Sequence, residues 1–497
     1  MSLTVSAEIM RRCEERHFAA GTANALELMQ IAGNGCAKLC LDFLAAQKNC
    51  RRIVIFAGSG NNGGDGVVMA SHLVQNQGLP VVLALIDRQK ISESSAFYYK
   101  KLDQRVTVAT AAQVELQRGD LVIDALLGTG CRAPMKEPYR SIIEYINNAH
   151  LPVFSVDIPS GLGTDRCIKA NITAAIGFYK DIFFTTEGIE MCGTLRRVPL
   201  PLDIAPDADK NAPLAADSYW FNSISKPVLR NVHKYQRGSV LICGGSCDFM
   251  QAPYLSAHGA LRAGAGLVRL AVPFAPVPGV GILAAIPTQV TDCNGQFCQK
   301  SLDDLQNAIA RADVIAAGPG MGRSQSVKEF IQALLTLEKP LLLDADALVA
   351  AADLLNQEHH SNILLTPHRG EARFLAEALQ IELCGDDLAD ARVLAQKSRC
   401  TVLLKGPRSV TAAPDGRAFI NTSGTPALAT AGSGDVLTGI AAAEMCCFAP
   451  LEAGARAAFL HGMAGELAAA VYGESGVIAD DLPQYAARAE AQLQKIL

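Results

Sequence analysis

Short runs of apolar residues alternate with stretches of helical periodicity through the first part of this chain. The apolar runs predict strands at residues 51–57, 80–86, 121–125 and 153–156, and the periodicity predicts helices at residues 7–17, 26–46 and 67–77. Strands that are apolar throughout and separated by helices are typical of a parallel sheet covered on both faces. Ligands of such sheets bind beyond the carboxyl ends of the strands. A site is therefore expected where three polar segments follow strands, at residues 61–66, 124–134 and 157–161.

The same alternation returns in the second half of the chain after an interruption. Residues 202–226 mix Pro, Asp, Ala and Lys without a period, which predicts a linker with the domain boundary near residues 205–225. The strands predicted beyond it are residues 240–243, 267–272, 314–317, 341–343, 363–365 and 401–404. A helix is predicted at residues 252–265, and further helices follow toward the C-terminus. The sequence therefore predicts an α/β protein with two three-layer sandwich domains, over residues 1–215 and 225–497.

Length, charge and composition narrow the class of protein. The 497 residues are too many for one hydrophobic core. The formal net charge of −5 gives no support to a nucleic-acid partner. The 15 Cys residues lack metal-ligand spacing and fit a reducing cytosol better than a disulfide scaffold. The first residues lack an apolar signal core, and no segment reaches the roughly 20 apolar residues of a membrane span. We therefore expect a cytoplasmic homo-oligomer that acts on small molecules, without a membrane partner.

The loop at residues 61–66 reads Asn-Asn-Gly-Gly-Asp-Gly and lies at a predicted strand-to-helix turn. Its backbone amides would suit a phosphate. It has neither the spaced glycines of a dinucleotide fingerprint nor the Lys and Ser/Thr of a Walker loop. A structural tight turn explains its composition equally well. Residues 128–134 form a second loop at the same edge, where Arg132 could meet a phosphate.

Further side chains at this edge carry candidate chemistry. The oxygens of Asn62, Asp124 and Ser160 are of the kind that bind an alkali cation. Asp157 and Lys180 are the two candidates for proton transfer. From its own sequence context, however, Lys180 is more simply explained as a surface lysine.

Four sequence motifs in the first half of the chain together indicate a specific protein family. They are residues 27–33 (Glu-Leu-Met-Gln-Ile-Ala-Gly), 61–66, 124–130 (Asp-Ala-Leu-Leu-Gly-Thr-Gly) and 156–161 (Val-Asp-Ile-Pro-Ser-Gly). With them, residues 3–200 resemble the NAD(P)H-hydrate epimerase family. The resemblance implies a Rossmann-like sandwich that epimerises C6 of hydrated NADH or NADPH with a bound potassium ion (K⁺). By position, the implied potassium ligands are Asn62, Asp124 and Ser160. The implied hydrate-binding residues are Asn61, Asn62, Gly63, Gly64, Asp65, Gly128, Thr129, Gly130, Cys131, Arg132, Ala133, Pro134 and Asp157.

The implied epimerisation is chemically consistent with these residues. The two C6 epimers could interconvert by loss and return of the hydroxyl through a ring iminium, which needs an acid/base group. Asp157 and Lys180 take that catalytic role by position. One region departs from the family, because residues 174–180 read Ala-Ala-Ile-Gly-Phe-Tyr-Lys where family members carry a Gly/Thr-rich stretch.

In the second half, several Gly-rich loops follow predicted strands, and residues 428–437 (Leu-Ala-Thr-Ala-Gly-Ser-Gly-Asp-Val-Leu) run into a helix. The first amides of a helix have no internal partner and bind anions. Asp435 beside them can be a helix N-terminal charge or a general base. Lys405 is a natural point charge for a nucleotide phosphate. His368 alone would more often be a structural loop histidine.

These loops belong to a set of motifs at residues 262–268, 318–322, 344–348, 366–371, 404–406 and 428–439. The set resembles the ADP/ATP-dependent NAD(P)H-hydrate dehydratases, whose fold is ribokinase-like. The implied hydrate contacts are Ala252, Gly320 or Gly322, His368 and Asp435. The implied nucleotide contacts are Lys405, Gly406, Pro407, Arg408, Ser409, Gly432, Ser433 and Gly434. One departure is Met250-Gln251 where relatives usually carry a Gly, which could narrow the hydrate pocket near Ala252.

The mechanism that this resemblance implies places Asp435 as the catalytic base. It activates the C6 hydroxyl toward the terminal phosphate of ADP or ATP, while the amides of Gly432 to Gly434 stabilise the transferred group. Mg²⁺ would shield the charge of the nucleotide, and ADP is expected as the co-substrate. Two other interpretations remain open from sequence. The second half could be a ribokinase-like small-molecule kinase, and the first half could be a non-catalytic ligand-binding domain.

Overall fold

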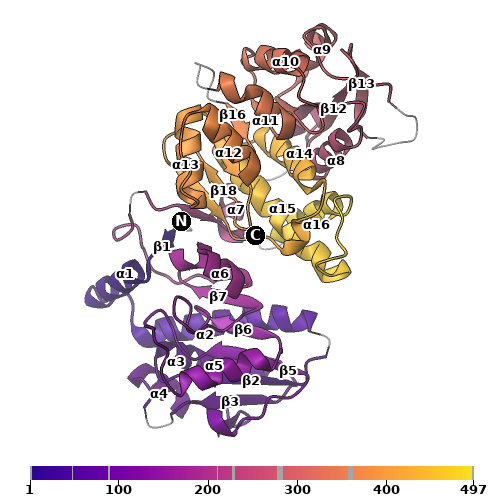
Figure 1. The fold of residues 1–497 in the computed structure, drawn as a ribbon. Helices are drawn as coiled ribbons and strands as arrows, with labels where there is room; N and C mark the ends of the chain where they lie inside the picture. The colour runs from indigo at the N-terminus through magenta and orange to yellow at the C-terminus, as the bar shows by residue number, and fades with distance from the viewer. Residues whose placement is uncertain are drawn as a thin grey trace. The chain divides into compact units, whose positions relative to one another are not determined.

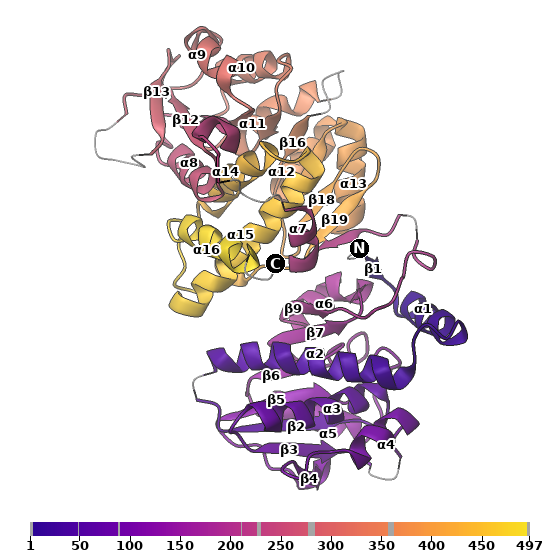
Figure 2. The same ribbon diagram turned by 180° about the vertical axis from the view of Figure 1, so that it is seen from behind.

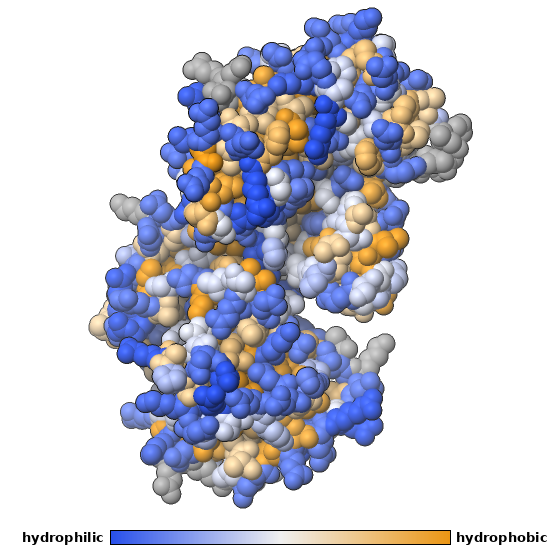
Figure 3. All heavy atoms as spheres, in the orientation of Figure 1, coloured by the Kyte–Doolittle hydropathy of each residue, from blue (hydrophilic) through white to orange (hydrophobic). Residues whose placement is uncertain are grey.

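The computed structural model describes residues 3–47, 49–87, 90–209, 211–225, 230–276, 284–355 and 362–494. Contacts between residues divide the chain into two compact units, Ser2–Ala212 and Pro213–Leu497 (Figures 1 and 2). Hydrophilic residues cover most of the face seen in Figure 3, and apolar residues lie between them in small groups. Within the described ranges, none of the helices has the length and apolar character needed to span a bilayer.

The N-terminal unit is built on one parallel sheet, whose described strands follow the order β4-β3-β2-β5-β6-β7-β9. Its strands are β2 (Arg52–Ala57), β3 (Val81–Leu85), β4 (Thr107–Thr110), β5 (Asp120–Ala125), β6 (Val153–Val156), β7 (Ile172–Ile176) and β9 (Thr194–Val198). Its helices are α1 (Ala7–Ala19), α2 (Ala25–Ala46), α3 (Asn61–Asn76), α4 (Glu93–Lys100), α5 (Tyr139–Asn148) and α6 (Thr186–Met191). The predicted parallel α/β sandwich is confirmed.

Successive side chains of β2 pack on opposite faces of this sheet. Ile53 and Ile55 belong to the apolar cluster that includes α2 and α3, whereas Val54 and Phe56 belong to the cluster that includes α5. Accordingly, α5 lies in front of the sheet in Figure 1 and α2 lies in front of it in Figure 2. This two-sided burial explains why the sequence of β2 is apolar throughout.

A short second sheet fixes the start of the chain. Strand β1 (Thr4–Val5) pairs in parallel with β8 (Tyr179–Lys180), and Val5 lies opposite Lys180. The hydroxyl of Ser6 then accepts a hydrogen bond from the amide of Ile9 and caps α1. The helix predicted at residues 7–17 is therefore attached directly beside one of the candidate catalytic residues.

Helix α3 begins at Asn61, so the prediction that residues 61–66 form a loop before a helix at 67–77 was wrong. The glycines there are needed for close packing instead. A Cβ atom on Gly63 would lie 2.0 Å from the carbonyl oxygen of Gly58, so only glycine allows the first turn of the helix to approach the preceding loop so closely.

The C-terminal unit contains a larger sheet, whose described strands follow the order β10-β19-β18-β17-β16-β15-β14-β11-β12-β13. Strand β18 is antiparallel to both of its neighbours, and the other pairings are parallel. The strands are β10 (Leu214–Ala216), β11 (Ser239–Cys243), β12 (Leu267–Val272), β13 (Ile286–Gln289), β14 (Val314–Ala317), β15 (Leu341–Leu343), β16 (Ile363–Leu365), β17 (Thr401–Leu404), β18 (Val410–Ala412) and β19 (Ala418–Asn421). The predicted α/β architecture is confirmed here as well.

Helices cover this second sheet in two groups. One apolar cluster joins alternate strand residues such as Val314 and Ala316 to α7, α8, α14, α15 and α16. Along the chain between them, α10 to α13 pack one against the next. The helices are α7 (Ser218–Ile224), α8 (Ala252–Arg262), α9 (Lys300–Arg311), α10 (Gln325–Leu335), α11 (Ala345–Ala351), α12 (Arg369–Ala378), α13 (Asp387–Ser398), α14 (Ser433–Met445), α15 (Pro450–Tyr472) and α16 (Leu482–Gln494).

The segment predicted as an irregular linker, residues 202–226, contains regular structure in its second part. Strand β10 pairs with β19, and Asp217 caps α7, which packs in the core of the C-terminal unit. These elements are too short to show a period in the sequence. Lys210 and Lys226 of the predicted linker lie outside the described residues.

Candidate functional sites

A cavity of about 810 Å³ opens at the carboxyl ends of the strands in the N-terminal unit. Three polar segments that follow β2, β5 and β6 contribute to its wall, as predicted for a parallel sheet. Its lining residues are Ala7, Glu8, Met10, Arg11, Glu14, Ser59, Gly60, Asn61, Asn62, Asp65, Leu126, Leu127, Gly128, Thr129, Gly130, Cys131, Arg132, Tyr139, Asp157, Ile176 and Lys180. Four of the predicted hydrate-binding residues, Gly63, Gly64, Ala133 and Pro134, are not among them.

Asp157 and Lys180 form a buried ion pair in this cavity. Nζ of Lys180 donates hydrogen bonds to Oδ1 of Asp157 and, over 2.8 Å, to the carbonyl oxygen of Ile176. The amide of Ile176 also donates to Oδ1 of Asp157, over 3.2 Å. Lys180 is 2 % exposed, so it is not the surface lysine that its sequence context suggested. Asp157 has a φ of +65°, a strained conformation for a residue with a side chain, and such strain is common at functional sites.

Three more carboxyl-bearing residues, Glu8, Glu14 and Asp65, line the same cavity. Burial, reinforced by the charges of Asp157 and Glu14, raises the pKa of Asp65 well above its usual value. Burial and the nearby Asp157 also raise the pKa of Glu14, against the opposing effect of Lys180. The cavity lining therefore combines three cationic side chains, Arg11, Arg132 and Lys180, with four carboxyl groups, and burial favours the protonated form of two of them, Asp65 and Glu14.

The predicted cation ligands Asn62, Asp124 and Ser160 lie together beside this cavity. The hydroxyl of Ser160 donates to Oδ1 of Asp124, and the amide of Ser160 donates to Oδ2 over 2.8 Å. Nδ2 of Asn62 donates to the carbonyl oxygen of Leu127, which also accepts from the Ser160 hydroxyl. Among the described residues, the buried Oδ1 of Asn62 has no hydrogen-bond partner. An unpaired amide oxygen next to carbonyl, hydroxyl and carboxylate oxygens is a donor set that fits an alkali cation.

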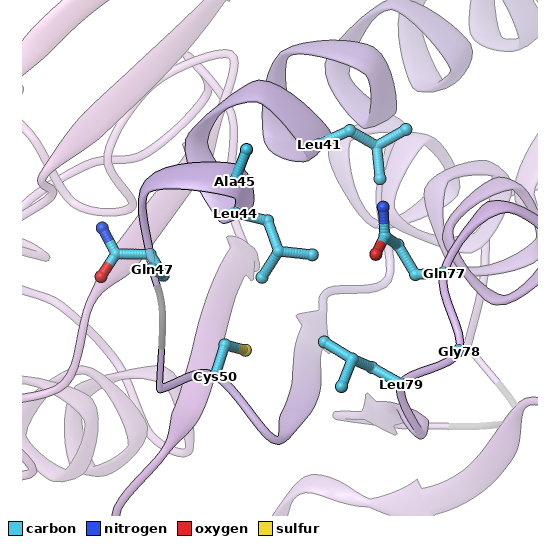
Figure 4. Close-up of a pocket in the computed structure, with 8 residues that line it drawn as sticks. All are labelled: Leu41, Leu44, Ala45, Gln47, Cys50, Gln77, Gly78 and Leu79. Carbon is cyan, nitrogen blue, oxygen red and sulfur yellow. The ribbon is translucent and has the colours of Figure 1, made fainter.

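A second depression in this unit, of about 510 Å³, has a different character (Figure 4). It lies at the end of α2, where Leu41 and Leu44 face Leu79. Leu79 lies two residues before the start of β3. Its one ionisable group is the thiol of Cys50, whose pKa is raised by burial. It contains none of the predicted site residues.

In the C-terminal unit, the Gly-rich segment before α14 makes a tight turn. Gly432 has a φ of +86° and caps the helix, which begins at Ser433. The helix presents its first free amides at this turn. Asp435 lies in the first turn of the helix, and burial together with the charge of Asp344 raises its pKa to about 7. A carboxyl group with such a pKa is suited to accept a proton near neutral pH.

Lys405 reaches the same turn from the end of β17. A Cβ atom placed on Gly434 would lie 3.6 Å from its Nζ. Nζ donates to Oδ1 of Asp344 over 2.7 Å and lies 3.7 Å from Oε2 of Glu371. Burial alone would lower the pKa of Lys405, but these two carboxylates outweigh it and raise that pKa. Lys405 is therefore a fixed positive charge beside the amides of the turn.

The buried carboxylate of Asp344 organises this region. In addition to Lys405, it accepts hydrogen bonds from the hydroxyls of Thr366 over 2.8 Å and of Thr438, on α14, over 2.7 Å. Asp344 thus connects the ends of β15, β16 and β17 to the helix that carries Asp435. The sequence motif at residues 344–348 was noted, but no role was predicted for Asp344.

His461, on α15, contacts the first residue of α14. Its Nε2 and the hydroxyl of Ser433 are hydrogen-bonded at 3.2 Å, and both residues are buried. Burial lowers the pKa of His461 to about 4, so the imidazole is neutral at physiological pH. No sequence signal pointed to this residue, because it lies within a long apolar helix.

The structure also places other predicted contacts of the C-terminal unit. A Cβ atom on Gly320 would lie 3.2 Å from Cβ of Ala252, so these two residues are neighbours, and Asp346 accepts a hydrogen bond from the amide of Gly322. The ring of His368 caps α12, and its backbone pairs with Lys405. Arg408, in contrast, is 6 % exposed and donates to the carbonyl oxygen of Thr422, so its guanidinium is directed into the interior.

Comparison with known proteins identifies the family of both units. A family model described as NAD(P)H-hydrate dehydratase matches residues 240–488, and one described as YjeF-related protein N-terminus matches residues 25–182. A bifunctional NAD(P)H-hydrate repair enzyme of Salinibacter ruber is 34 % identical over 94 % of this chain and 92 % of its own length. The chain belongs to the bifunctional NAD(P)H-hydrate repair enzymes.

Other members of the bifunctional NAD(P)H-hydrate repair enzymes match in the same way. The Escherichia coli enzyme is 32 % identical over 92 % of this chain and 88 % of its own length. Among solved structures, an ADP/ATP-dependent NAD(P)H-hydrate dehydratase from Bacillus subtilis, co-crystallized with ATP/Mg²⁺, is 26 % identical over 57 % of this chain and all of that chain, with a TM-score of 0.47. The dehydratase match lies in the C-terminal unit of this repair enzyme, and the YjeF-related match lies in its N-terminal unit.

Proposed function

We propose that the N-terminal unit interconverts the two C6 epimers of hydrated NADH and NADPH, and that the C-terminal unit dehydrates the S epimer to NAD(P)H. The second step consumes ADP and yields AMP and phosphate. The observation that carries the proposal is the position of Asp435, with a pKa of about 7, in the N-terminal turn of α14 beside Gly432, Gly434 and the ammonium of Lys405. The two reactions form one repair sequence, because the first supplies the epimer that the second uses.

In the dehydration, the carboxylate of Asp435 accepts the proton of the C6 hydroxyl, and the oxygen attacks the terminal phosphorus of ADP. The amides of the turn and Lys405 are preorganised donors for the charge that develops on the transferred phosphoryl group. The C6–O bond then breaks as phosphate leaves with the bonding pair, the ring nitrogen forms an iminium, and loss of a proton from C5 restores the ring. Ala252 and Gly320 form a neighbouring wall that suits the nicotinamide end of the hydrate.

Mg²⁺ would enter this site with the nucleotide. The ion is usually held by substrate phosphates and one or two carboxylates. Among the described residues there is no group of three or more His, Cys, Asp or Glu that could hold a metal ion. Asp344, Asp346 and Glu371 are the carboxylates whose charges act on Asp435 at this site.

In the epimerisation, Asp157 and Lys180 handle the proton of the water that leaves and returns. The oxygens of Asn62, Asp124 and Ser160 would hold K⁺, which supplies positive charge at the edge of the cavity. The loop at Gly128 to Arg132 lines the same cavity and suits the phosphates of the dinucleotide. A homo-oligomer in the cytoplasm stays a prediction from sequence.

The test uses the purified full chain with each hydrate epimer separately. With the S epimer and ADP we expect reduced-nicotinamide absorbance and free phosphate to appear together, and with the R epimer we expect the same after epimerisation. Asp435→Asn should abolish recovery while the nucleotide still binds. A stable phosphorylated product would instead identify a small-molecule kinase, and recovery from the S epimer alone would leave the N-terminal unit as a non-catalytic ligand-binding domain.

A further inference from the structure

Helix α1 turns one of its faces toward the cavity of the N-terminal unit. Four of its lining residues, Ala7, Met10, Arg11 and Glu14, have the three- and four-residue spacing of one helical face. The sulfur end of Met10 packs on Gly177, where a Cβ atom would lie 2.7 Å from Cε of Met10. Gly177 follows Ile176, whose backbone holds both Asp157 and Lys180. Glu14 lies one turn beyond Met10 on the same face.

The helix is fixed in this orientation from both ends. Its first residues follow β1, in which Val5 pairs with Lys180. On the side away from the cavity, Arg16 donates to Oδ2 of Asp207 over 2.9 Å, and Arg12 donates to the carbonyl oxygen of Asp207 over 2.9 Å. These contacts leave α1 little freedom to rotate, so the carboxyl group of Glu14 stays at the cavity.

The carboxyl group of Glu14 has no structural role that its contacts reveal. Among the described residues, no hydrogen bond or ion pair engages its carboxyl group, whereas the neighbouring Glu15 pairs with Arg11 over 2.6 Å at the surface. A half-buried carboxyl group without a partner carries a desolvation cost that a structural role does not explain. Burial and Asp157 raise its pKa, which favours the protonated, proton-donating form.

Epimerisation at one carbon requires proton transfer on both faces of the ring, and two carboxyl groups in the cavity can provide it. The hydroxyl leaves from one face of the ring and water returns to the opposite face, so proton transfer is needed on both faces. Asp157, after β6, and Glu14, on α1, bring carboxyl groups to one cavity from two different elements of the fold. Resting on the proposed epimerase function, we propose that Glu14 is a second catalytic acid/base of the N-terminal site and serves the ring face opposite to that served by Asp157.

The step balances as follows on the Glu14 side. The carboxyl proton of Glu14 passes to the C6 hydroxyl, the C6–O bond breaks with its electron pair on oxygen, and water leaves. The lone pair of the ring nitrogen forms the iminium. On the other face a water oxygen bonds to C6, its proton passes to Asp157, and the iminium electrons return to nitrogen. The reverse reaction exchanges the roles of the two carboxyl groups.

The experiment compares Glu14→Gln with the unaltered enzyme and with Glu190→Gln, a control at an exposed glutamate of α6 that does not line the cavity. Each epimer is incubated in ¹⁸O-labelled water, and both inversion at C6 and label uptake are followed. Glu14→Gln should slow inversion by about 100-fold, as expected for loss of a general acid. It should keep uptake of label with retention of configuration in one epimer, because the Asp157 face still works. Glu190→Gln should match the unaltered enzyme.

Three outcomes would overturn the assignment of Glu14. Inversion by Glu14→Gln within twofold of the unaltered rate would show that its carboxyl group is not used. Loss of inversion and label uptake in equal proportion would show that Glu14 does not serve one face. Equal activity of Glu14→Asp and Glu14→Gln would show that the carboxyl group is not what matters. If the unaltered enzyme itself does not interconvert the epimers, the proposed epimerase function fails and the result does not depend on Glu14.

Discussion

The ammonium of Lys405 and the carboxylate of Asp344 lie 2.7 Å apart beneath the turn that precedes α14. Asp344 is buried, and its second oxygen accepts from Thr438 on that helix. One carboxylate therefore positions both the positive charge and the helix that bears Asp435. This coupling means that Lys405 and Asp435, the groups proposed to act on the phosphate, should respond together when Asp344 is changed.

The first prediction concerns Asp344→Asn. The neutral amide leaves Lys405 with Glu371, at 3.7 Å, as its remaining anionic partner, so the ammonium loses its fixed position. We expect the KM for ADP in the dehydration to rise about tenfold or more and the free energy of unfolding to fall by about 2 kcal/mol. Steady-state kinetics and chemical denaturation measure the two effects. Asp353→Asn, at an exposed surface pair with Lys328, is the matched control and should change neither.

The second prediction concerns the pH dependence of dehydration. Asp435 must be ionised to accept the hydroxyl proton, and its pKa is raised to about 7 by burial and by Asp344. We therefore expect kcat/KM for the S hydrate to fall about tenfold for each pH unit below that value and to level off above it. A flat profile through the neutral range would contradict the role of Asp435 as the base.

The third prediction concerns the stability of Asp435→Asn. The folded-state pKa of Asp435 is raised from 3.8 to about 7, so the contribution of this group to stability is fully present below pH 3.8 and is lost as the pH rises through 7. Asparagine has no charge to bury. At mildly alkaline pH we expect the variant to melt about 3 to 6 °C higher than the unaltered enzyme. Calorimetry should show this gain shrinking as the pH is lowered, and a lower melting temperature at alkaline pH would contradict it.

The fourth prediction concerns the alkali cation. Because the buried Oδ1 of Asn62 has no donor among the described residues, a bound K⁺ should relieve that cost and stabilise the N-terminal unit. We expect KCl to raise the melting temperature of this unit and its epimerisation rate more than an equal concentration of choline chloride. Asn62→Ala should need about tenfold more K⁺ for half-maximal activation. Asn76→Ala, at the exposed end of the same helix, should respond like the unaltered protein.

The sequence predicted the parallel sheets well, because strands buried on both faces, such as β2, are apolar throughout. Elements that depend on tertiary contacts were missed. The first turn of α3 is rich in Gly and Asn, and it is helical because Gly63 packs against the backbone of Gly58. Strand β10 is stabilised by its pairing with β19, which no local pattern in the linker indicates.

The candidate sites were predicted in part for the same reason. Loops at the ends of apolar strands carry most of the site residues, so their clustering follows from the topology. The burial of Lys180, the hydrogen bond of His461 to Ser433 and the exposure of Glu14 to the cavity depend instead on how distant segments pack. In the sequence, the charges of α1 resemble those of any solvated helix face.

The pairing of Leu214–Ala216 with Phe419–Asn421 also decides where the two activities can be separated genetically. A dehydratase fragment that begins after Ala216 would leave β19 as an exposed edge strand, whose unpaired backbone groups could pair with another molecule. An epimerase fragment extended past Ala212 would carry an exposed apolar segment that is prone to aggregation. The two halves of the gene should therefore be divided between the codons for Ala212 and Pro213.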